Sequence, residues 1–198
     1  YAASHDLQEP LRGVAGCVQL LEQYYGAQLD AQAHQFVAHA VAGVTRMQTL
    51  IHDLLTYARV RTHEKPFEPV DCARLLKDVL ANLEVAIHEN QVCLTHEALP
   101  TVMADPTQLL QVFQNLLGNA IKFRSAQPLA IHIGVARCHG TWVFSVRDNG
   151  IGINKEYTDN LFSLFPRLHQ EDNFPSTGVG LAICKRIVER HGGRIWAD

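Results

Sequence analysis

The chain of 198 residues carries 17 lysine and arginine residues against 20 aspartate and glutamate residues, a formal net charge of −3, and 47% of its residues are hydrophobic. These values allow one large domain or two small ones with a proper core, and the interspersed charges exclude the basic footprint of a nucleic-acid-binding protein. Five scattered cysteines without paired spacing argue against a disulfide framework or a zinc site and fit a reducing, cytoplasmic compartment. No apolar run is long enough to span a bilayer, and no signal peptide opens the chain.

Residues 1–62 are predicted to form two helices joined by a turn, an all-α helical hairpin. Apolar residues recur at alternating spacings of three and four along both helices, which is the pattern of a heptad seam. Gly26 falls in the turn between them, and Asp30 is in position to cap the second helix. The seam residues are Leu7, Leu11, Val14, Val18 and Leu21 in the first helix and Val37, Ala40, Val44, Met47, Ile51, Leu54 and Ala58 in the second.

A hairpin of two helices is too thin to bury both seams by itself. The length and regularity of the seam favour a dimeric four-helix bundle, a homodimer formed by two copies of the hairpin. The alternative is a hairpin that packs on the second domain of its own chain.

A linker is expected over residues 63–69, because Pro66 and Pro69 stand among charged residues and break the helical pattern. Residues 70–198 then combine helical and strand patterns, with the strands mostly adjacent, which indicates an α/β two-layer sandwich. The chain begins without a helix cap and stops at Asp198 as a further strand begins, so we expect it to be a C-terminally truncated piece of a longer protein. Helices are predicted over 72–90, 106–123 and 180–193, and strands over 91–97, 129–136 and 141–149.

The helix predicted over 106–123 carries a polar face. Asn115 and Asn119 are four residues apart and present two carboxamides on one side, and Lys122 follows on nearly the same side. Carboxamide oxygens suit a hard cation such as Mg2+, which keeps several waters and takes phosphate oxygens, and an ammonium adds a point charge for those phosphates. Asparagines are also common on exposed helix faces, so this pair alone proves little.

Two glycine-containing stretches follow. In "DNGIGI" the carboxylate of Asp148 precedes Gly150 and Gly152, where a flat ligand can approach the backbone closely. In "STGVGLAI" Gly178 and Gly180 open a helix, whose free backbone N–H groups cradle anions. Neither stretch is a Walker A loop or a dinucleotide fingerprint, and a single such stretch more often marks an ordinary turn. Their order along one chain is the informative feature.

Together these motifs resemble the sensor histidine kinases of two-component signalling, over essentially the whole chain. "SHDLQEPLR" (residues 4–12) resembles the H box around the phosphoacceptor, and "QVFQNLLGNAIKF" (residues 111–123) resembles the N box. "DNGIG" and "STGVGLAI" match the glycine boxes, and "LFSLFPRLH" between them matches the F box. The wording of "HDLQEP", "NAIKFR" and "RLHQED" is similar to the kinase modules of phytochrome-like sensors.

The resemblance implies a Bergerat-type ATP site. By similarity, Asp148 would accept the adenine amino group, with Gly152 beside the ring. Asn119, helped by Asn115, would hold Mg2+, and Lys122 would approach the phosphates of ATP. The further residues implied at this site are Phe123, Gly150, Thr177, Gly178 and Gly180, and residues 155–177 would form a lid that contains Phe162, Phe165 and Arg167.

The resemblance also makes His5 the phosphoacceptor. On a helical wheel His5 lies opposite the seam and so faces out of the bundle. A neutral imidazole is expected, since an unperturbed histidine titrates at about 6.5, and Asp6 can hydrogen-bond its δ nitrogen and leave the ε nitrogen to attack phosphorus. Glu9 stands where many bifunctional relatives carry threonine or asparagine to position water for dephosphorylation. Pro10 is expected to bend the helix beside His5.

The implied activity is ATP-dependent autophosphorylation of His5, followed by phosphoryl transfer to an aspartate in the receiver domain of a response regulator. The implied protein is a homodimer with an upstream sensor domain that this chain does not include. Two alternatives remain within the family: a phosphatase-dominant sensor and a catalytically silent dimeric scaffold for the regulator. A gyrase-type ATPase would explain the glycine boxes, but it leaves the histidine-bearing hairpin unexplained.

Overall fold

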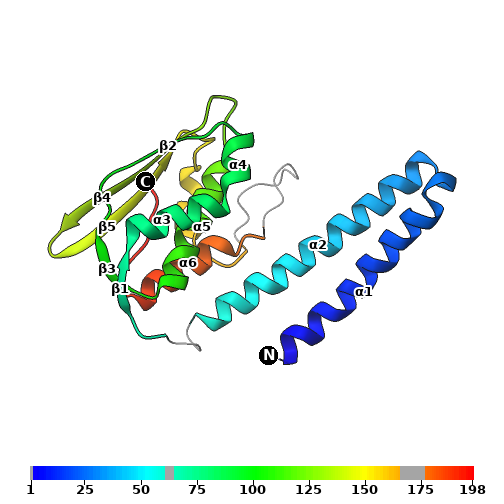
Figure 1. The fold of residues 1–198 in the computed structure, drawn as a ribbon, viewed down its shortest axis with the longest axis horizontal. Helices are drawn as coiled ribbons and strands as arrows, with labels where there is room; N and C mark the ends of the chain where they lie inside the picture. Colours follow the sequence, from blue (N-terminus) through cyan, green and yellow to red (C-terminus); the bar gives the residue numbers. More distant parts are fainter. Residues whose placement is uncertain (1, 61–64, 166–176) are drawn as a thin grey trace.

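The computed structural model describes the chain except for residues 1, 61–64 and 166–176 and the side chains of residues 2–7, 155, 156 and 159 (Figure 1). It shows a long helical hairpin followed by an α/β domain, as the sequence predicts. Within the described residues, no helix combines the length and apolar character that a membrane span requires.

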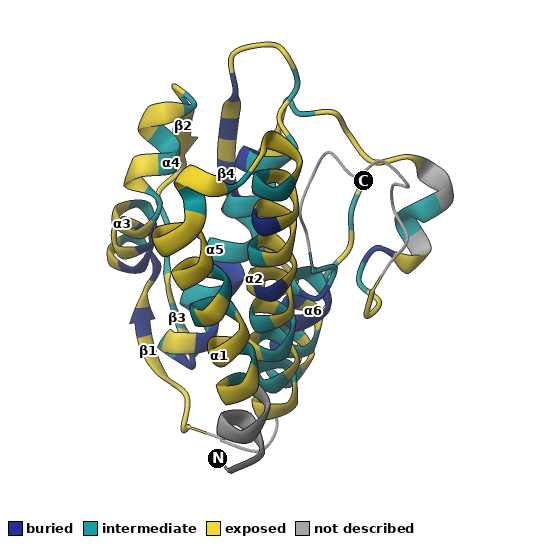
Figure 2. Ribbon diagram, turned by 90° about the vertical axis from the view of Figure 1, so that its right-hand side faces the viewer, coloured by how far each residue is buried: buried dark blue, intermediate teal, exposed yellow. Residues whose placement is uncertain are grey.

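The hairpin consists of α1 (Ala2–Tyr25) and α2 (Ala31–Arg59), which run antiparallel and are joined by the short helical turn η1 (Gly26–Gln28) (Figure 1). Helix α1 continues through Pro10. The predicted cap of α2 is confirmed, because the Asp30 carboxylate accepts the Ala33 N–H at 2.7 Å. From Gln8 onward, most residues of α1 are exposed to solvent (Figure 2).

The two sets of seam residues on α2 differ in burial. Val37 and Val44, seven residues apart, are buried in the hairpin. Met47 and Leu54, also seven residues apart, remain 44% and 47% exposed. The hairpin therefore covers one half of the α2 seam and leaves the other half accessible.

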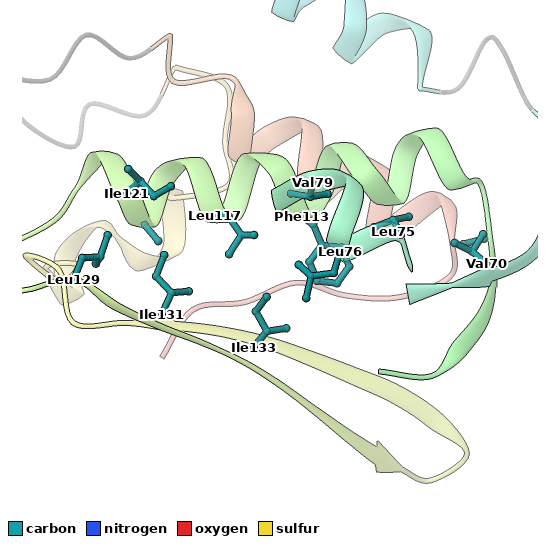
Figure 3. Close-up of a cluster of buried hydrophobic side chains, with 12 residues drawn as sticks. Val70, Leu75, Leu76, Val79, Phe113, Leu117, Ile121, Leu129, Ile131 and Ile133 are labelled. Atoms are coloured by element: carbon teal, nitrogen blue, oxygen red, sulfur yellow. The ribbon is translucent and has the colours of Figure 1, made fainter. Parts of the chain in front are cut away.

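The α/β domain has two layers. In the main sheet the strand order is β2-β4-β5, with β2 parallel and β5 antiparallel to β4, and β1 and β3 form a separate antiparallel pair. Helices α3 and α5 pack on one face of the main sheet (Figure 3). The elements are β1 (Glu68–Asp71), α3 (Cys72–Asn82), α4 (Glu84–Glu89), β2 (Cys93–His96), β3 (Thr101–Ala104), α5 (Pro106–Lys122), β4 (Ala130–Cys138), β5 (Thr141–Asp148), η2 (Lys155–Asn160) and α6 (Gly180–Arg190).

The main core lies between the sheet and α5 (Figure 3). Phe113, Leu117 and Ile121 follow one another at four-residue spacing on α5 and are buried. Ile131 and Ile133 alternate along β4 and meet them from the sheet. This arrangement fixes which face of α5 is left for polar side chains.

A second apolar cluster joins the hairpin to the α/β domain. Leu50 and Tyr57 of α2 pack against buried residues of α6, including Ile183 and Ile187. The guanidinium of Arg186 lies 4.3 Å from the centre of the Tyr57 ring. The alternative in which the hairpin packs on its own chain is therefore realised for the C-terminal half of α2, whereas Met47 and Leu54 stay exposed.

A buried polar cluster holds the start of α5 and the end of α6 together. Arg190 donates to the Asp105 carboxylate at 3.1 Å, to the Gln108 side-chain oxygen at 2.6 Å and to the Lys65 carbonyl at 2.8 Å. Asp105 also caps α5, and its backbone N–H donates to His191 Nε2 at 3.0 Å. The backbone at Lys65 is thereby fixed to the end of α6.

Four local predictions need correction. The helix predicted over 72–90 is two helices, because Leu83 leaves the helical conformation with φ −104° and ψ 7°. Strands β1 and β3 were not predicted, and β1 begins at Glu68, inside the expected linker 63–69. The strand expected to begin near Asp198 is not formed, because residues 193–198 are paired with no described strand.

Candidate functional site

The polar face of α5 lies beside the start of α6. Asn115 and Asn119 are both half-buried, which follows from the opposite face of α5 filling the core. The Asn115 amide donates to the Gly180 carbonyl at 3.4 Å. A Cβ on Gly180 would lie 3.4 Å from Asn115 Oδ1, an ordinary van der Waals distance, so the two residues are close neighbours. The predicted metal-binding face and the predicted phosphate-binding helix start are thus adjacent.

Lys122 ends α5 in a partly apolar setting. Its Nζ lies 5.5 Å from the centre of the Phe123 ring. Burial lowers the pKa of Lys122 from its ordinary value of 10.5, because the charged form loses water. An anionic ligand beside this ammonium would restore the stabilisation that burial removes.

The turn after β5 meets the end of α5. The Ile151 N–H donates to the Phe123 carbonyl at 3.0 Å. A Cβ on Gly150 would stand 2.4 Å from that oxygen, so only glycine fits there without displacing the backbone. The Gly150 N–H donates to Asp148 Oδ1 at 2.9 Å, and the Asp148 carboxylate is exposed at the end of the strand. Three predicted cofactor residues, Phe123, Asp148 and Gly150, are therefore in one place.

Gly152 and Gly178 both adopt the left-handed conformation, with φ +74° and +68°. At Gly152 an added Cβ would have no atom within 4 Å, so its requirement for glycine comes from the backbone and not from packing. The Gly178 carbonyl accepts the Phe165 N–H at 3.2 Å. Residue 167 of the predicted lid lies outside the described residues.

Thr177 contacts the hairpin. Its hydroxyl donates to Asp53 Oδ2 at 2.5 Å, across 124 residues of sequence. Asp53 belongs to the part of α2 that faces α6, so the predicted phosphate-binding hydroxyl is held by the helical hairpin. Nothing in the sequence near Asp53 signals this contact.

The predicted catalytic residues of the hairpin lie near the start of α1. His5 and Asp6 belong to α1, and their side chains are outside the described set. Glu9 is exposed. Because the hairpin is antiparallel, this end of α1 lies at the same end of the hairpin as the C-terminus of α2, where the α/β domain is attached (Figure 1).

Two residues of the site were not identified from the sequence. Asn149 lies within "DNGIGI", and it makes three hydrogen bonds that fix the turn after β5. Asp53 carries no motif at all. An asparagine that directly follows a strand and precedes glycine is a typical signal for a side-chain-stabilised turn, so the first could have been found.

The donor set on α5 fits a hard cation. Across the residues that the structure describes, no group of three or more histidine, cysteine, aspartate or glutamate side chains is placed to hold a metal ion. A cation here would instead take carboxamide oxygens from Asn115 and Asn119 together with waters and phosphate oxygens, which is a usual coordination for Mg2+.

Comparison with protein families gives two matches. The family described as "His Kinase A (phospho-acceptor) domain" matches residues 1–63. The family described as "Histidine kinase-, DNA gyrase B-, and HSP90-like ATPase" matches residues 104–198. The two matches fall on the hairpin and on most of the α/β domain.

Individual proteins are similar to the chain along its whole length. Cyanobacterial phytochrome A of Nostoc sp. is 54% identical over the whole chain, and the phytochrome-like protein Cph1 of Synechocystis sp. is 48% identical. The chain spans 26% of the length of each of these relatives. Among solved structures, full-length ShkA in complex with AMPPNP matches 96% of this chain and 40% of its own, at 28% identity and a TM-score of 0.69.

Proposed function

The chain belongs to the two-component sensor histidine kinases, and we propose that it transfers the γ-phosphoryl group of ATP to His5 and passes it on to an aspartate of a response regulator. The observation that carries the proposal is the meeting of three motifs on α5. Phe123 touches the turn that holds Asp148, and Asn115 touches Gly180 at the start of α6. These contacts bring a candidate adenine acceptor and a candidate phosphate-binding helix start to the same helix.

At the adenine end, the Asp148 carboxylate accepts a hydrogen bond from the amino group of the base. Its Oδ1 already accepts the Gly150 N–H, which leaves Oδ2 for the ligand. The open space around Gly152 admits the edge of a flat ring. ShkA, the structural relative with AMPPNP, supports an adenine nucleotide as the ligand of this fold.

At the phosphate end, the side-chain oxygens of Asn119 and Asn115 hold Mg2+, and Lys122 contacts the phosphates. When bound, Mg2+ neutralises charge on the β- and γ-phosphates. Thr177 and the backbone N–H groups at Gly178 and Gly180 close on the phosphate oxygens, as the start of a helix does for anions.

At the hairpin, Asp6 accepts from His5 Nδ1 and so keeps the tautomer in which Nε2 carries the lone pair. Nε2 attacks the γ-phosphorus in line, the bond from that phosphorus to the bridging oxygen breaks, and ADP leaves with the electron pair. Glu9 orients water when the regulator is dephosphorylated.

The proposed domains are a dimerisation and phosphotransfer hairpin (1–62), a linker that ends where β1 begins at Glu68, and a catalytic domain that extends from β1 to residue 198. The hairpin forms a homodimer, because a second copy would cover the exposed half of the seam. Val14 and Leu21 on α1 are 50% and 45% exposed, comparable to the outward seam residues of α2. A four-helix bundle places both halves of each seam in its core.

A response regulator receiver domain is the proposed partner, an upstream sensor domain supplies the signal, and the cytoplasm is the proposed compartment. All five cysteines are free thiols, which fits a reducing compartment. Phosphatase-dominant activity and a silent scaffold are the outcomes that the following experiment separates from kinase activity.

The test is incubation of the chain with γ-labelled ATP and Mg2+. We expect a label on the wild type that is acid-labile and alkali-stable, as a phosphohistidine is, and that disappears in His5→Gln. His39→Gln, which changes an exposed histidine on α2, is the matched control and should label like the wild type. Absence of label in a chain that binds ATP would reject the kinase proposal, and adding phosphorylated regulator would then distinguish phosphatase from scaffold.

A further inference from the structure

Asn149 follows the last residue of β5 and holds three hydrogen bonds to the segment that leads into β4. Its Oδ1 accepts the Ala130 N–H at 2.8 Å, and its Nδ2 donates to the Pro128 carbonyl at 2.9 Å. Its own carbonyl accepts the Ser125 hydroxyl at 3.2 Å. The turn after β5 is thus joined to the start of the neighbouring strand by both side chain and backbone.

The side-chain bond from Asn149 to the Ala130 N–H takes the place of the next backbone hydrogen bond between β4 and β5. Ile131 on β4 pairs with Asp148 on β5, the final backbone pair at this end of the ladder. One residue further, the Ala130 N–H is taken by the Asn149 side chain. Because the side-chain amide substitutes for a backbone acceptor, the backbone at Asn149 can leave the strand direction and turn towards α5.

The other side of the turn is fixed by the end of α5. The Ile151 N–H donates to the Phe123 carbonyl, and Gly150 passes so close to that oxygen that it has no room for a side chain. Asp148 therefore stands between two attachments, one through Asn149 and one through Phe123. Its carboxylate is held further by the Gly150 N–H.

We infer that Asn149 is a positioning residue for base recognition: it fixes the carboxylate of Asp148 relative to the base and so sets selectivity for adenine over guanine. The inference rests on the proposed function. Adenine presents an amino donor where guanine presents a carbonyl acceptor. A carboxylate fixed in place accepts from the first and repels the second, whereas a carboxylate that moves away discriminates less.

The test measures binding of ADP, GDP and inorganic tripolyphosphate by isothermal titration calorimetry. Asn149→Ala removes two side-chain hydrogen bonds, so we expect about a tenfold loss in ADP affinity, with tripolyphosphate affinity changed by less than about twofold. The ratio of ADP to GDP affinity should fall by about the same factor as ADP affinity. A merely structural role would weaken all three ligands alike, and that result would overturn the inference.

Two further variants keep the test decisive if Asn149→Ala folds poorly. Asn149→Asp keeps the acceptor for Ala130 but sets a carboxylate oxygen against the Pro128 carbonyl, and it should lower the ratio. Ser125→Ala removes the bond to the Asn149 carbonyl, together with the 3.3 Å bond that Ser125 Oγ accepts from the Gln127 N–H. It leaves both side-chain bonds of Asn149 in place and should lower the ratio by a smaller factor. An unchanged ratio in both would overturn the inference.

Asn90→Ala is the matched control. The Asn90 amide donates to the Ala86 carbonyl at 2.7 Å, so the variant removes a comparable hydrogen bond in the same domain, at the C-cap of α4. It should leave the affinity ratio unchanged. A wild-type chain that binds no ADP would overturn the proposed function together with this inference, whereas normal ADP binding with a wild-type ratio in Asn149→Ala would overturn this inference alone.

Discussion

Gly150 and Gly152 are two residues apart, yet they exclude side chains for different physical reasons. At Gly150 the obstacle is the Phe123 carbonyl, which a Cβ would overlap. At Gly152 the space is open, and the constraint is a φ of +74° that residues with a Cβ adopt only at a free-energy cost. The first glycine is part of the packing of the site, and the second borders the space proposed for the base.

Gly152→Ala should therefore destabilise the domain by about 1 kcal/mol and weaken ATP binding, because the added methyl group enters the space proposed for the ring. Gly140→Ala is the control: Gly140 has φ +83° and no atom within 4 Å of an added Cβ, and it lies in the β4–β5 turn. Urea unfolding and nucleotide titration of both variants check this. Equal stability losses with a binding defect only in Gly152→Ala are expected, and a binding defect in both would refute the assignment.

The buried thiols make stability depend on alkaline pH. Burial raises the pKa of the Cys184 thiol from 9.0 to about 12. Burial, with the charge of Asp71, raises that of Cys72 from 9.0 to about 11. Above pH 9 the unfolded chain releases these protons while the folded chain keeps them, so stability is lost as pH rises from 9 towards these values. The lowered pKa of Lys122 has the opposite effect on stability. The folded chain releases that proton at a lower pH than the unfolded chain does, so this group adds stability as the pH rises.

Between about pH 8 and about pH 10 each buried thiol should cost about 1 kcal/mol of unfolding free energy. We expect the wild type to lose about 2 kcal/mol more over this interval than a variant with both Cys72→Ala and Cys184→Ala. Urea unfolding in a reducing buffer measures the difference. The paired change Cys17→Ala and Cys93→Ala removes exposed thiols and should retain the wild-type pH dependence.

Among the helices, α5 depends more strongly on its N-cap residue, Asp105, than α3 depends on its own, Asp71. Asp71 and Asp105 both cap a helix, each accepting two backbone N–H groups. Asp105 differs because its carboxylate also pairs with Arg190, and the two side chains are only 3% and 9% exposed. A buried cation left without its partner is costly.

Asp105→Ala should therefore lower the unfolding free energy by about 3–5 kcal/mol, whereas Asp71→Ala should lower it by about 1 kcal/mol. Asp105→Asn keeps a capping oxygen but loses the charge, and it should fall between them. Chemical denaturation of the three variants measures these values. Equal losses for Asp71→Ala and Asp105→Ala would contradict a stabilising role for the Arg190 pair.

Helix α5 was predictable because its determinants are local. Asp105 and proline at the first position mark its start, and apolar residues at four-residue spacing mark its buried face. Strands β1 and β3 are four residues long and, among the strands that the structure describes, pair only with each other, so alternation has too few positions to be recognised. The break at Leu83 was missed because no glycine or proline marks it.

The sequence predicts those residues of the candidate site that lie within a short motif. The places of Asn115, Asp148 and Gly180 followed from short segments whose residue types serve one chemistry. The contact between Asp53 and Thr177 was not predictable, because its partners are 124 residues apart and the two domains must dock before it exists. Long-range contacts of this kind depend on tertiary packing.

At the scale of the whole molecule, the exposed half of the seam predicts the oligomeric state. Met47→Glu or Leu54→Glu places a charge in the core of the proposed bundle and should convert the dimer to a monomer. Val85→Glu changes an apolar residue that is 70% exposed on α4 and should leave the dimer intact. Sedimentation velocity distinguishes these states. A wild-type chain that sediments as a monomer would reject the homodimer.

The hydrogen bond between Thr177 and Asp53 connects the two parts of the chain in thermodynamic terms. A hydroxyl has one proton to donate, so Thr177 serves either α2 or a phosphate oxygen at a given moment. If a bound nucleotide accepts that hydrogen bond, nucleotide binding and docking of α2 are coupled, and the coupling is reciprocal. The factor by which docking of α2 lowers nucleotide affinity equals the factor by which bound nucleotide lowers the docking equilibrium constant. The docking of α2 would then set the dissociation constant for nucleotide, and occupancy of the ATP site would in turn set how often α2 is docked.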